Sequence, residues 1–438
     1  DGSVGRQALV TEPLAQALDA EPSTVVFACG PPEMLEAVRI LCTARGVTAQ
    51  LALEAGMACG FGACFGCVVP TSEGYVRLCV DGPVLDAERL EGDLPRGRAA
   101  SAVGARSASP GATKAGAPPA RSGAGPPSAG PVELCGVHLG GPVLNGSGTF
   151  DAIAARRAFG DALLERFPFH AFVSKTITLE PRQGNSPPRL WETPAGLINS
   201  IGLPNKGLAG FIASDLPELA ELPVPLVVSL MGFSRDELAQ LVTALGRRDE
   251  VAMIELNFSC PNVETGLVMG ADPGESAAAV ERVRPLTDKP LIVKLTPNAS
   301  EPAAVARASE EAGADAVSLI NTLKGMALAP DAGRPWLGGT TGGVSGPAVR
   351  AIALEQVHSV AGAVRIPVIG MGGIGSGRHA ADLLAAGAAA VAVGTESFRD
   401  PAAGRRVAAE LAELQRAGAE PPAAKSEPLT VESQPPAA

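Results

Sequence analysis

Eight short apolar runs, each followed by a stretch with helical periodicity, dominate the sequence between Pro131 and about Arg416. Such runs are typical of buried parallel strands, and each parallel connection needs a crossover that is usually a helix. Eight units of this kind predict an α/β fold whose sheet closes on itself as a (β/α)8 TIM barrel. The expected strands are Val143–Asn145, Phe172–Ser174, Leu226–Val228, Met253–Leu256, Leu291–Val293, Val317–Ile320, Val368–Ile369 and Val391–Val393.

Polar or glycine residues follow every one of these runs. They are, in chain order, Ser147, Lys175, Ser229, Asn257, Lys294, Asn321, Gly372–Gly373 and Gly394–Thr395. The carboxyl ends of the strands form the rim on which barrels of this type place their functional sites. An open, doubly wound sheet is the alternative, but it does not explain why a polar or glycine residue follows all eight strands.

The densest polar cluster follows the run Met253–Leu256, where Asn257, Cys260 and Asn262 lie within six residues. The two carboxamides can recognise the carbonyl, N–H and carboxylate groups of a small ring. A thiol between them can accept a proton if its pKa lies near the working pH. The alternative is that Cys260 is an inert buried residue, as a single cysteine after a strand often is.

Glycine turns and two lysines predict a phosphorylated cofactor on the same rim. Gly370–Ile374 and Gly394–Thr395 each lead toward a helix, Gly342–Gly346 stands at another helix start, and backbone N–H groups at helix starts bind phosphate. Lys175 and Lys294 each follow a buried run, so we expect their ammonium groups to point into the barrel opening rather than into solvent. Two cations beside an anchored ring suit a reduced flavin.

Four cysteines near the N-terminus have the spacing C-x4-C-x2-C followed by a distant fourth, at Cys59, Cys64, Cys67 and Cys79. This is the plant-type arrangement for a [2Fe–2S] cluster, and the intervening glycines let N–H groups approach the sulfur atoms. Structural zinc is the alternative, but four-cysteine zinc sites normally use two C-x2-C pairs and only one is present.

The remaining segments complete the expected domain organisation. Residues 1–49 read as helix, strand and helix, too few to bury a core alone, and residues 50–93 form the cluster domain. Residues 94–131 are rich in Ala, Gly, Pro, Ser and Arg and are expected to be a disordered linker. The barrel then covers residues 132–416, and residues 417–438 form a tail expected to be disordered.

Composition excludes several classes of function. A net charge of −11 and a pI near 5.1, without a Lys/Arg cluster, argue against nucleic-acid binding. No apolar run approaches the length of a membrane span, and Asp1 is not followed by a secretory leader, so a cytoplasmic location is expected.

The segment from Val132 to about Arg416 resembles the catalytic subunit of class 1B dihydroorotate dehydrogenase. The motifs that carry the resemblance are Asn145–Phe150, Ser174–Thr176, Leu197–Asn205, Asn257–Val263, Ile320–Thr322, Gly342–Pro347, Gly370–Ile374 and Val393–Thr395. Residues 1–93 resemble the C-terminal part of the electron-transfer subunit of the same enzyme family, which predicts a fusion of two normally separate subunits with the first one truncated. Within this part, Phe27–Met34 is similar to the final portion of a ferredoxin-reductase-like NAD-binding lobe, although a neutral strand-turn-helix is the alternative.

The resemblance implies the roles of individual residues. Cys260 would act as the base that removes a proton from C5 of dihydroorotate while hydride leaves C6 for N5 of FMN. The expected substrate contacts are Lys175, Asn199, Ser200, Ile201, Gly202, Leu203, Asn257, Asn262, Asn321 and Thr322. The expected FMN contacts are Ser147, Lys175, Thr176, Asn257, Lys294, Ile320, Gly346, Gly372, Gly373, Gly394 and Thr395. Ser229 stands where related enzymes often have an Asn, which places that FMN contact in doubt.

The resemblance also implies oxidation of dihydroorotate to orotate in the synthesis of UMP, with electrons passed to the [2Fe–2S] cluster. FAD and NAD would be reached only through a missing lobe or a partner subunit, and a homodimer through the barrel is expected. Two alternatives are a dihydropyrimidine-type flavin oxidoreductase, whose substrate lacks the carboxylate, and a non-catalytic electron carrier with a vestigial barrel. Lys175 with Asn199 and Asn262 favours a carboxylated ring, and Cys260 with both lysines counts against a vestigial barrel.

Overall fold

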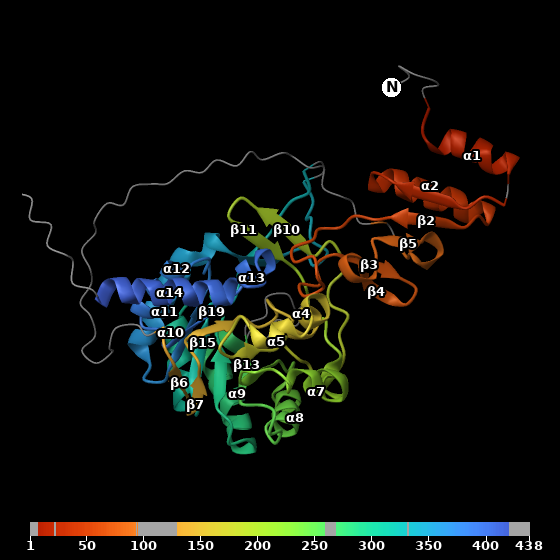
Figure 1. Cartoon of the computed structure of the whole chain (residues 1–438). Helices are drawn as coiled ribbons and strands as arrows, with labels where there is room; N and C mark the ends of the chain where they lie inside the picture. The colour runs from red at the N-terminus through yellow and green to blue at the C-terminus, as the bar shows by residue number, and fades with distance from the viewer. Residues whose placement is uncertain are drawn as a thin grey trace, which may run out of the picture.

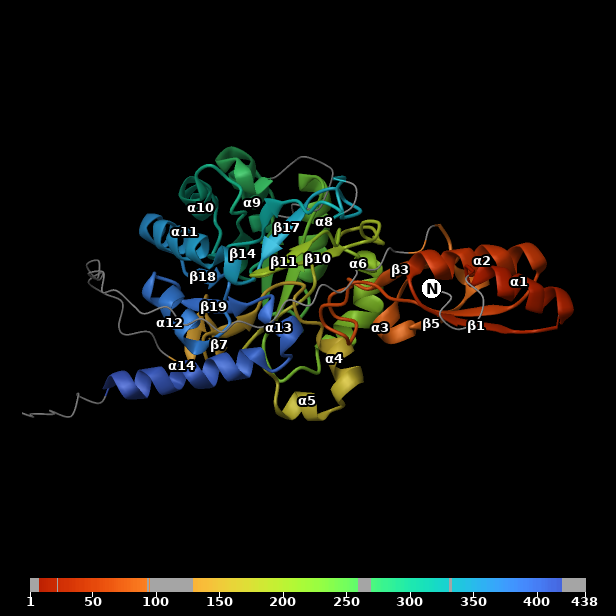
Figure 2. The same cartoon turned by 90° about the horizontal axis from the view of Figure 1, so that it is seen from above.

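A computed structural model describes residues 8–21, 23–92, 94, 129–258, 269–330 and 333–419. Figures 1 and 2 show a barrel and, beside it, a smaller N-terminal part that contacts it at one end. Among the described residues, no helix has the length and apolarity required to cross a membrane.

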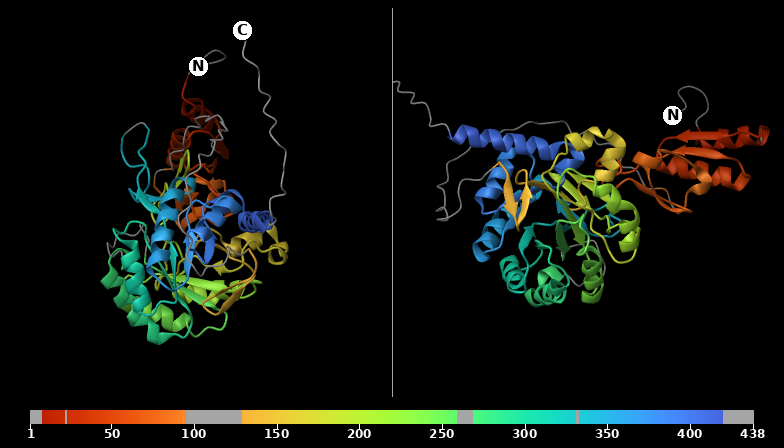
Figure 3. Two further views of the ribbon diagram at one scale, coloured as in Figure 1. Left: turned by 90° about the vertical axis from the view of Figure 1, so that its left-hand side faces the viewer. Right: turned by 60° about the horizontal axis from the view of Figure 1, so that its bottom comes forward.

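Eight parallel strands form the barrel, as the sequence predicts. Their order in the sheet is β8-β19-β18-β15-β14-β13-β12-β9, with β8 and β9 at its two ends. Consecutive barrel strands are therefore neighbours, although β10 and β11 intervene in the chain between β9 and β12, and β16 and β17 between β15 and β18. The view along the barrel in Figure 3 shows the helices arranged around these strands. The strands are β8 (Val143–Asn145), β9 (Phe172–Val173), β12 (Leu226–Leu230), β13 (Met253–Asn257), β14 (Leu291–Lys294), β15 (Ala316–Leu319), β18 (Val368–Met371) and β19 (Ala390–Val393).

Side chains that alternate along these strands build two apolar cores. Outward residues such as Ile254 and Leu256 join a large cluster with the surrounding helices, whereas inward residues such as Met253 and Ile292 fill the barrel interior. The helices of this part are α4 (Ala152–Phe159), α5 (Ala162–Glu165), α6 (Gly207–Gly210), α7 (Leu216–Leu219), α8 (Arg235–Leu245), α9 (Pro273–Val283), α10 (Pro302–Glu311), α11 (Arg350–Ala363), α12 (Gly377–Ala385), α13 (Glu396–Arg399) and α14 (Ala403–Ala419).

Two short sheets lie at opposite ends of the barrel. The hairpin of β6 (Val132–Leu134) and β7 (Val137–Leu139) packs its leucines into the interior core from below. Above the carboxyl ends of the strands lies an antiparallel sheet in the order β10-β11-β17-β16. Its strands are β10 (Leu190–Thr193), β11 (Gly196–Asn199), β16 (Leu323–Gly325) and β17 (Gly342–Ser345), and we call it the cover sheet.

The N-terminal part has a core of its own that runs from Leu18 to Leu94. The predicted helix, strand and helix are present as α1, β1 and α2, and a hairpin through Ser72 joins β3 to β4. Because β1 pairs with β2 and β2 with β5, residues before and after the cysteine motif share one sheet. The elements are α1 (Thr11–Ala20), β1 (Val26–Cys29), α2 (Pro32–Arg45), β2 (Ala49–Ala52), β3 (Val68–Thr71), β4 (Gly74–Arg77), α3 (Leu78–Asp81) and β5 (Val84–Asp86).

Candidate active site

A cavity lies at the carboxyl ends of the barrel strands, beneath the cover sheet. Seven strand ends contribute to it, because consecutive parallel strands all deliver their following residues to the same rim. The predicted site residues that line it are Ser147, Lys175, Thr176, Asn199, Ile201, Gly202, Leu203, Asn257, Lys294, Ile320, Asn321, Thr322, Gly346, Gly372, Gly373, Gly394 and Thr395. The structure therefore brings together residues that are up to about 250 positions apart in the sequence.

Three predicted positions differ from this set. Cys260 and Asn262 lie outside the described residues. Ser200 is fully buried and does not line the cavity; its Oγ accepts a hydrogen bond from Asn185 Nδ2 at 3.0 Å. Ser200 therefore lies behind the cavity wall, next to Asn199. Asn199 itself lines the cavity and donates from Nδ2 to the carbonyl of Gly343.

The glycine turns after β17, β18 and β19 lie against one another. A Cβ built on Gly373, which has φ +70°, would stand 3.1 Å from the Gly346 carbonyl, and one on Gly346, with φ +89°, would stand 3.7 Å from Thr395 Cγ2. Thr395 Oγ1 also donates to Ser345 Oγ at 2.9 Å. The Gly346 turn thus lies against both of the others at one edge of the cavity, an arrangement that suits a single phosphate.

A hydrogen-bonded network lies directly below the cavity. Thr176 Oγ1 accepts from Asn257 Nδ2 at 2.9 Å and lies 3.0 Å from Ser229 Oγ, which donates to Glu255 Oε1 at 2.9 Å. Ser318 Oγ donates to the other oxygen of Glu255 at 3.1 Å. Ser229 does not line the cavity, so its role here is to link Thr176 to Glu255.

The two predicted lysines occupy different surroundings. Lys294 is 4% exposed, and its Nζ lies 3.7 Å from Glu255 Oε1, so a buried ion pair holds it below the cavity. Lys175 Nζ lies 3.8 Å from the ring centroid of Phe65, a residue of the N-terminal part. Burial lowers the pKa of Lys175 to about 8, against the opposing effect of the Asp151 carboxylate. Both ammonium groups face the same cavity, which favours negative charge there.

The four N-terminal cysteines meet in two pairs. Cys59 and Cys64 hydrogen-bond to each other, as do Cys67 and Cys79, and backbone N–H groups of Cys64 and Cys79 approach the sulfur atoms of Cys59 and Cys67. Within the part of the chain that the structure describes, no three such side chains are arranged around one metal ion. Two pairs of thiols suit two iron atoms, each with two protein ligands, better than one tetrahedral zinc ion.

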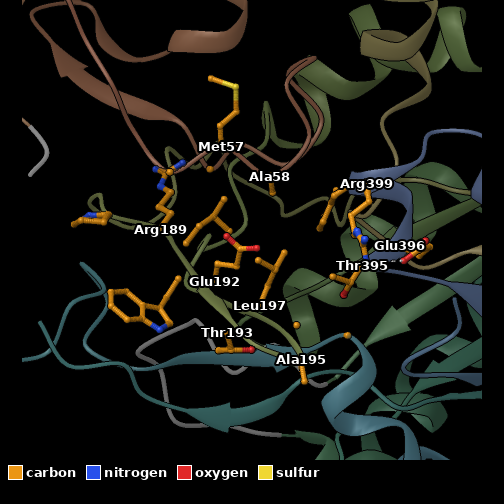
Figure 4. A pocket seen from close by; sticks show the side chains of 18 of the residues that line it. Met57, Ala58, Arg189, Glu192, Thr193, Ala195, Leu197, Thr395, Glu396 and Arg399 are labelled. Atoms are coloured by element: carbon orange, nitrogen blue, oxygen red, sulfur yellow. Dashed lines mark ion pairs between the residues drawn. The ribbon is translucent and has the colours of Figure 1, made fainter. Parts of the chain in front are cut away.

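The cysteine loop reaches the barrel cavity itself. Cys64 is one of the residues that line the cavity holding Lys175 and the glycine turns. A second cavity of about 610 Å³ lies at the same junction, between Met57 of the N-terminal part and the cover sheet (Figure 4). In Figure 4, Arg189 extends toward the ribbon that carries Met57, while Thr395 and Arg399 border the opposite side.

Comparison with known proteins agrees with this geometry. Residues 131–414, more than half of the chain, match the family model for dihydroorotate dehydrogenase. The chain belongs to the dihydroorotate dehydrogenase family. Residues 54–91 match the iron-sulfur cluster binding domain of dihydroorotate dehydrogenase B, which confirms the predicted fusion of the cluster-binding part to the catalytic part of this enzyme. This dihydroorotate dehydrogenase is an oxidoreductase, and its family implies FMN and an iron–sulfur cluster.

Curated relatives of the chain include catalytic subunits of dihydroorotate dehydrogenase B. The dihydroorotate dehydrogenase B (NAD(+)) catalytic subunit of Citrifermentans bemidjiense is 45% identical over 281 residues, which make up 64% of this chain and 91% of the relative. The same subunit of Trichlorobacter lovleyi is 46% identical over 278 residues, 63% of this chain and 90% of the relative. Apart from Cys64, the residues that line the cavity lie within residues 131–414, the segment that matches the family model.

The residues of this dihydroorotate dehydrogenase fit FMN. Three glycine turns suit its phosphate, and Lys294, Asn257 and Thr176, which line the same cavity, carry groups that could donate hydrogen bonds to its ring. Sequence reasoning missed Glu255, Phe65 and Arg189. Glu255 carried a signal, because it is a carboxylate inside an otherwise apolar run, whereas Phe65 and Arg189 acquire their roles only where the two parts meet.

Proposed function

We propose that this dihydroorotate dehydrogenase oxidises dihydroorotate to orotate in the cavity at the carboxyl ends of its barrel strands, in the pathway to UMP, and passes the electrons to a [2Fe–2S] cluster. The observation that supports this most directly is that Cys64 lines the same cavity as Lys175 and the glycine turns. A cluster held by Cys59, Cys64, Cys67 and Cys79 would then lie next to the flavin.

The residues of the cavity divide into a phosphate end and a ring end. Gly346, Gly373 and Thr395 would hold the FMN phosphate, with Gly372 and Gly394 beside them, and Lys294 would lie by the ring. Asn199, Asn257, Asn321 and Thr322 would present amide and hydroxyl groups to the orotate ring. Lys175 would attract its carboxylate, because a buried ammonium binds an anion more strongly than an exposed one.

Cys260 would remove the proton from C5, a role that rests on its sequence position three residues after Asn257. When bound, FMN supplies the acceptor for the hydride that leaves C6. The buried network of Thr176, Ser229 and Glu255 would keep Asn257 and Lys294 in fixed orientations during this step. Transfer of electrons from the cluster to FAD and NAD would require a partner subunit, and assembly as a homodimer stays a prediction.

Anaerobic titration of the purified chain tests the proposed activity. Dihydroorotate should bleach the flavin absorbance and then produce the low-temperature paramagnetic signal of a reduced [2Fe–2S] cluster. Dihydrouracil, which lacks the carboxylate, should do neither at the same concentration, because Lys175 would have no anionic partner. Equal reduction by both compounds would favour a dihydropyrimidine-type enzyme, and no reduction by either would refute the proposal.

Replacement of the proposed base is the second test. Cys260→Ala should retain FMN but slow flavin reduction by dihydroorotate by about 10²-fold or more, the loss expected for a general base. The measurement is stopped-flow absorbance under anaerobic conditions, with Cys135→Ala as the control, since that thiol lies at the far end of the barrel and bonds to the Asp315 carbonyl. A near-native rate in Cys260→Ala would remove Cys260 from this role.

A further inference from the structure

Phe65 lies inside the cysteine motif, between Cys64 and Cys67, and makes contacts outside its own domain. Its backbone has φ +56°, a conformation that residues other than glycine rarely adopt. Such a conformation persists only where the surrounding structure requires it. Lys175 Nζ of the barrel lies 3.8 Å from the ring centroid, and Arg77 Cζ lies 4.8 Å from it. Two cations over one aromatic ring give the loop an electrostatic attachment as well as an apolar one.

Arg189 of the barrel binds the same residue through its backbone. The side chain is 1% exposed, and all three of its nitrogens donate to main-chain carbonyls: Nε to Asn185 at 2.6 Å, Nη2 to Gln183 at 2.7 Å, and Nη1 to Phe65 at 3.3 Å. Two of these bonds stiffen the segment that carries Arg189, and the third crosses to the cysteine loop. Such a planar, fixed set of donors is a property of arginine that lysine does not share.

The adjacent residues fit closely as well. A Cβ built on Gly66 would stand 2.0 Å from Leu190 Cδ1, so a glycine at this position permits the close approach of the two segments. Leu190 lines the barrel cavity together with Cys64. Phe65 and Gly66 on one side, and Arg189 and Leu190 on the other, form a contact that we call the docking clamp.

We propose that Arg189 is a positioning residue for electron transfer, which holds the cysteine loop against the barrel cavity through the Phe65 carbonyl. This inference rests on the proposed function, because it concerns the step after flavin reduction. In that step the reduced flavin passes one electron to the oxidised cluster. A one-electron acceptor must then take this electron from the cluster before the flavin can pass on its second electron. Hydride transfer from dihydroorotate takes place between the substrate and the flavin and does not involve the cluster. Loss of the clamp should therefore slow reduction of the cluster and leave reduction of the flavin unchanged.

The experiment measures the two steps separately in the full chain loaded with FMN and cluster. Arg189→Met places at this position an apolar side chain that cannot bond the Phe65 carbonyl. Phe65→Gly removes the ring that contacts Lys175 but keeps the carbonyl, at a φ that glycine adopts readily. Arg157→Met is the matched control, because Arg157 lines a cavity at the same junction but pairs with Glu218 and is 67% exposed.

We expect anaerobic stopped-flow to show flavin reduction by dihydroorotate at the native rate in Arg189→Met and in the control. Freeze-quench paramagnetic resonance should show the cluster reduced about tenfold more slowly in Arg189→Met, the loss in docked population expected when a bond to a buried charged group is removed. Phe65→Gly should also slow reduction of the cluster, because it removes the ring that Lys175 and Arg77 contact.

A structural readout accompanies the kinetics. Hydrogen exchange of peptides that cover residues 59–68 should be faster in both clamp variants and unchanged in Arg157→Met, while the cluster absorbance is retained. Native cluster reduction in Arg189→Met would overturn the proposal. Failure of dihydroorotate to reduce the flavin of the native chain would instead refute the proposed function, so the two failures are distinguishable.

Discussion

Glu255 is a carboxylate in the middle of a barrel strand, 3% exposed, where an apolar residue would usually lie. Its two oxygens accept from Ser229 and Ser318, and its charge faces the Lys294 ammonium. Burial of a charge is costly unless that charge is paired and hydrogen-bonded, and here both conditions are met. The pair places a cation below the flavin cavity without leaving an uncompensated charge in the barrel interior.

Glu255→Gln should therefore destabilise the protein even though it preserves the shape of the side chain. Loss of one partner of a buried ion pair costs about 3 kcal/mol or more, because the other charge is left without compensation. The free energy of unfolding in urea measures this cost. The control is the same substitution in a Lys294→Met background, where it should cost less. An equal cost in both backgrounds would show that the ion pair contributes nothing.

His170 gives the barrel a pH-dependent component of stability. Its Nδ1 accepts a hydrogen bond from the Val143 amide at 3.3 Å, which requires the neutral ring, and burial lowers its pKa below the ordinary 6.5. Between the lowered pKa and 6.5, the unfolded chain binds the proton more readily than the folded one. The contribution of His170 is thus fully present above pH 6.5 and is lost as the pH falls through the lowered pKa.

Thermal unfolding at about pH 7.5 and about pH 5.5 tests this component, since these values lie on either side of the ordinary histidine pKa. The fall in melting temperature on acidification should be smaller in His170→Gln than in the native chain, because the amide oxygen accepts the Val143 bond at both pH values. His138→Gln, an exposed position on β7, should respond to pH as the native chain does. An identical response in all three would exclude His170 as a source of the pH dependence.

At the scale of elements, the cover sheet converts an open rim into a cavity. β11 carries Asn199 and pairs with β17, which ends at the glycine turn of Gly346. Asn199 and the Gly346 turn, on different sides of the cavity, are therefore joined by one antiparallel pair. The close approach of these strands requires a residue without a side chain at Gly196, where a Cβ would stand 1.9 Å from the Ser345 carbonyl oxygen.

Gly196→Ala should separate β11 from β17 and weaken FMN binding by about tenfold or more, since it displaces the Gly346 turn from its two neighbours. Fluorescence titration of the apoprotein with FMN measures this loss. Gly136→Ala is the control: Gly136 also has a positive φ, +80°, but a Cβ there meets no atom within 4 Å. It should lose stability through backbone strain, about 1 to 2 kcal/mol, while FMN binding stays native.

At the scale of the whole molecule, the barrel cavity and the cysteine loop of this chain are in contact. The iron–sulfur region matched at residues 54–91 lies beside a barrel that begins more than 30 residues later, and Cys64 reaches the cavity of that barrel. Covalent linkage raises the effective concentration of one part near the other. The molecule thus keeps a cluster-binding domain and a dihydroorotate dehydrogenase barrel in one chain.

Cys64→Ser should separate reduction of the flavin from reduction of the cluster. The variant should lose the paramagnetic signal of the reduced cluster, because a hydroxyl is a poor replacement for a thiolate ligand, while dihydroorotate still reduces the bound FMN. Cys42→Ser, a buried cysteine of α2 outside the motif, should retain the signal. An unchanged signal in Cys64→Ser would assign the cluster to other residues.

The sequence by itself determined the barrel and most of the cavity. Most strands are apolar runs that end in a polar or glycine residue, and parallel topology delivers these residues to one rim. The positions of Lys175, Asn257 and Gly373 in the chain therefore suffice to group them. Only the tertiary structure decided the contacts between segments that no periodicity relates. Ser200 lies behind the cavity wall, Glu255 pairs with Lys294 across neighbouring strands, and Arg189 bonds Phe65 across two domains. Each of these contacts depends on distances set by the packing of separate elements and not on the order of residues in the chain.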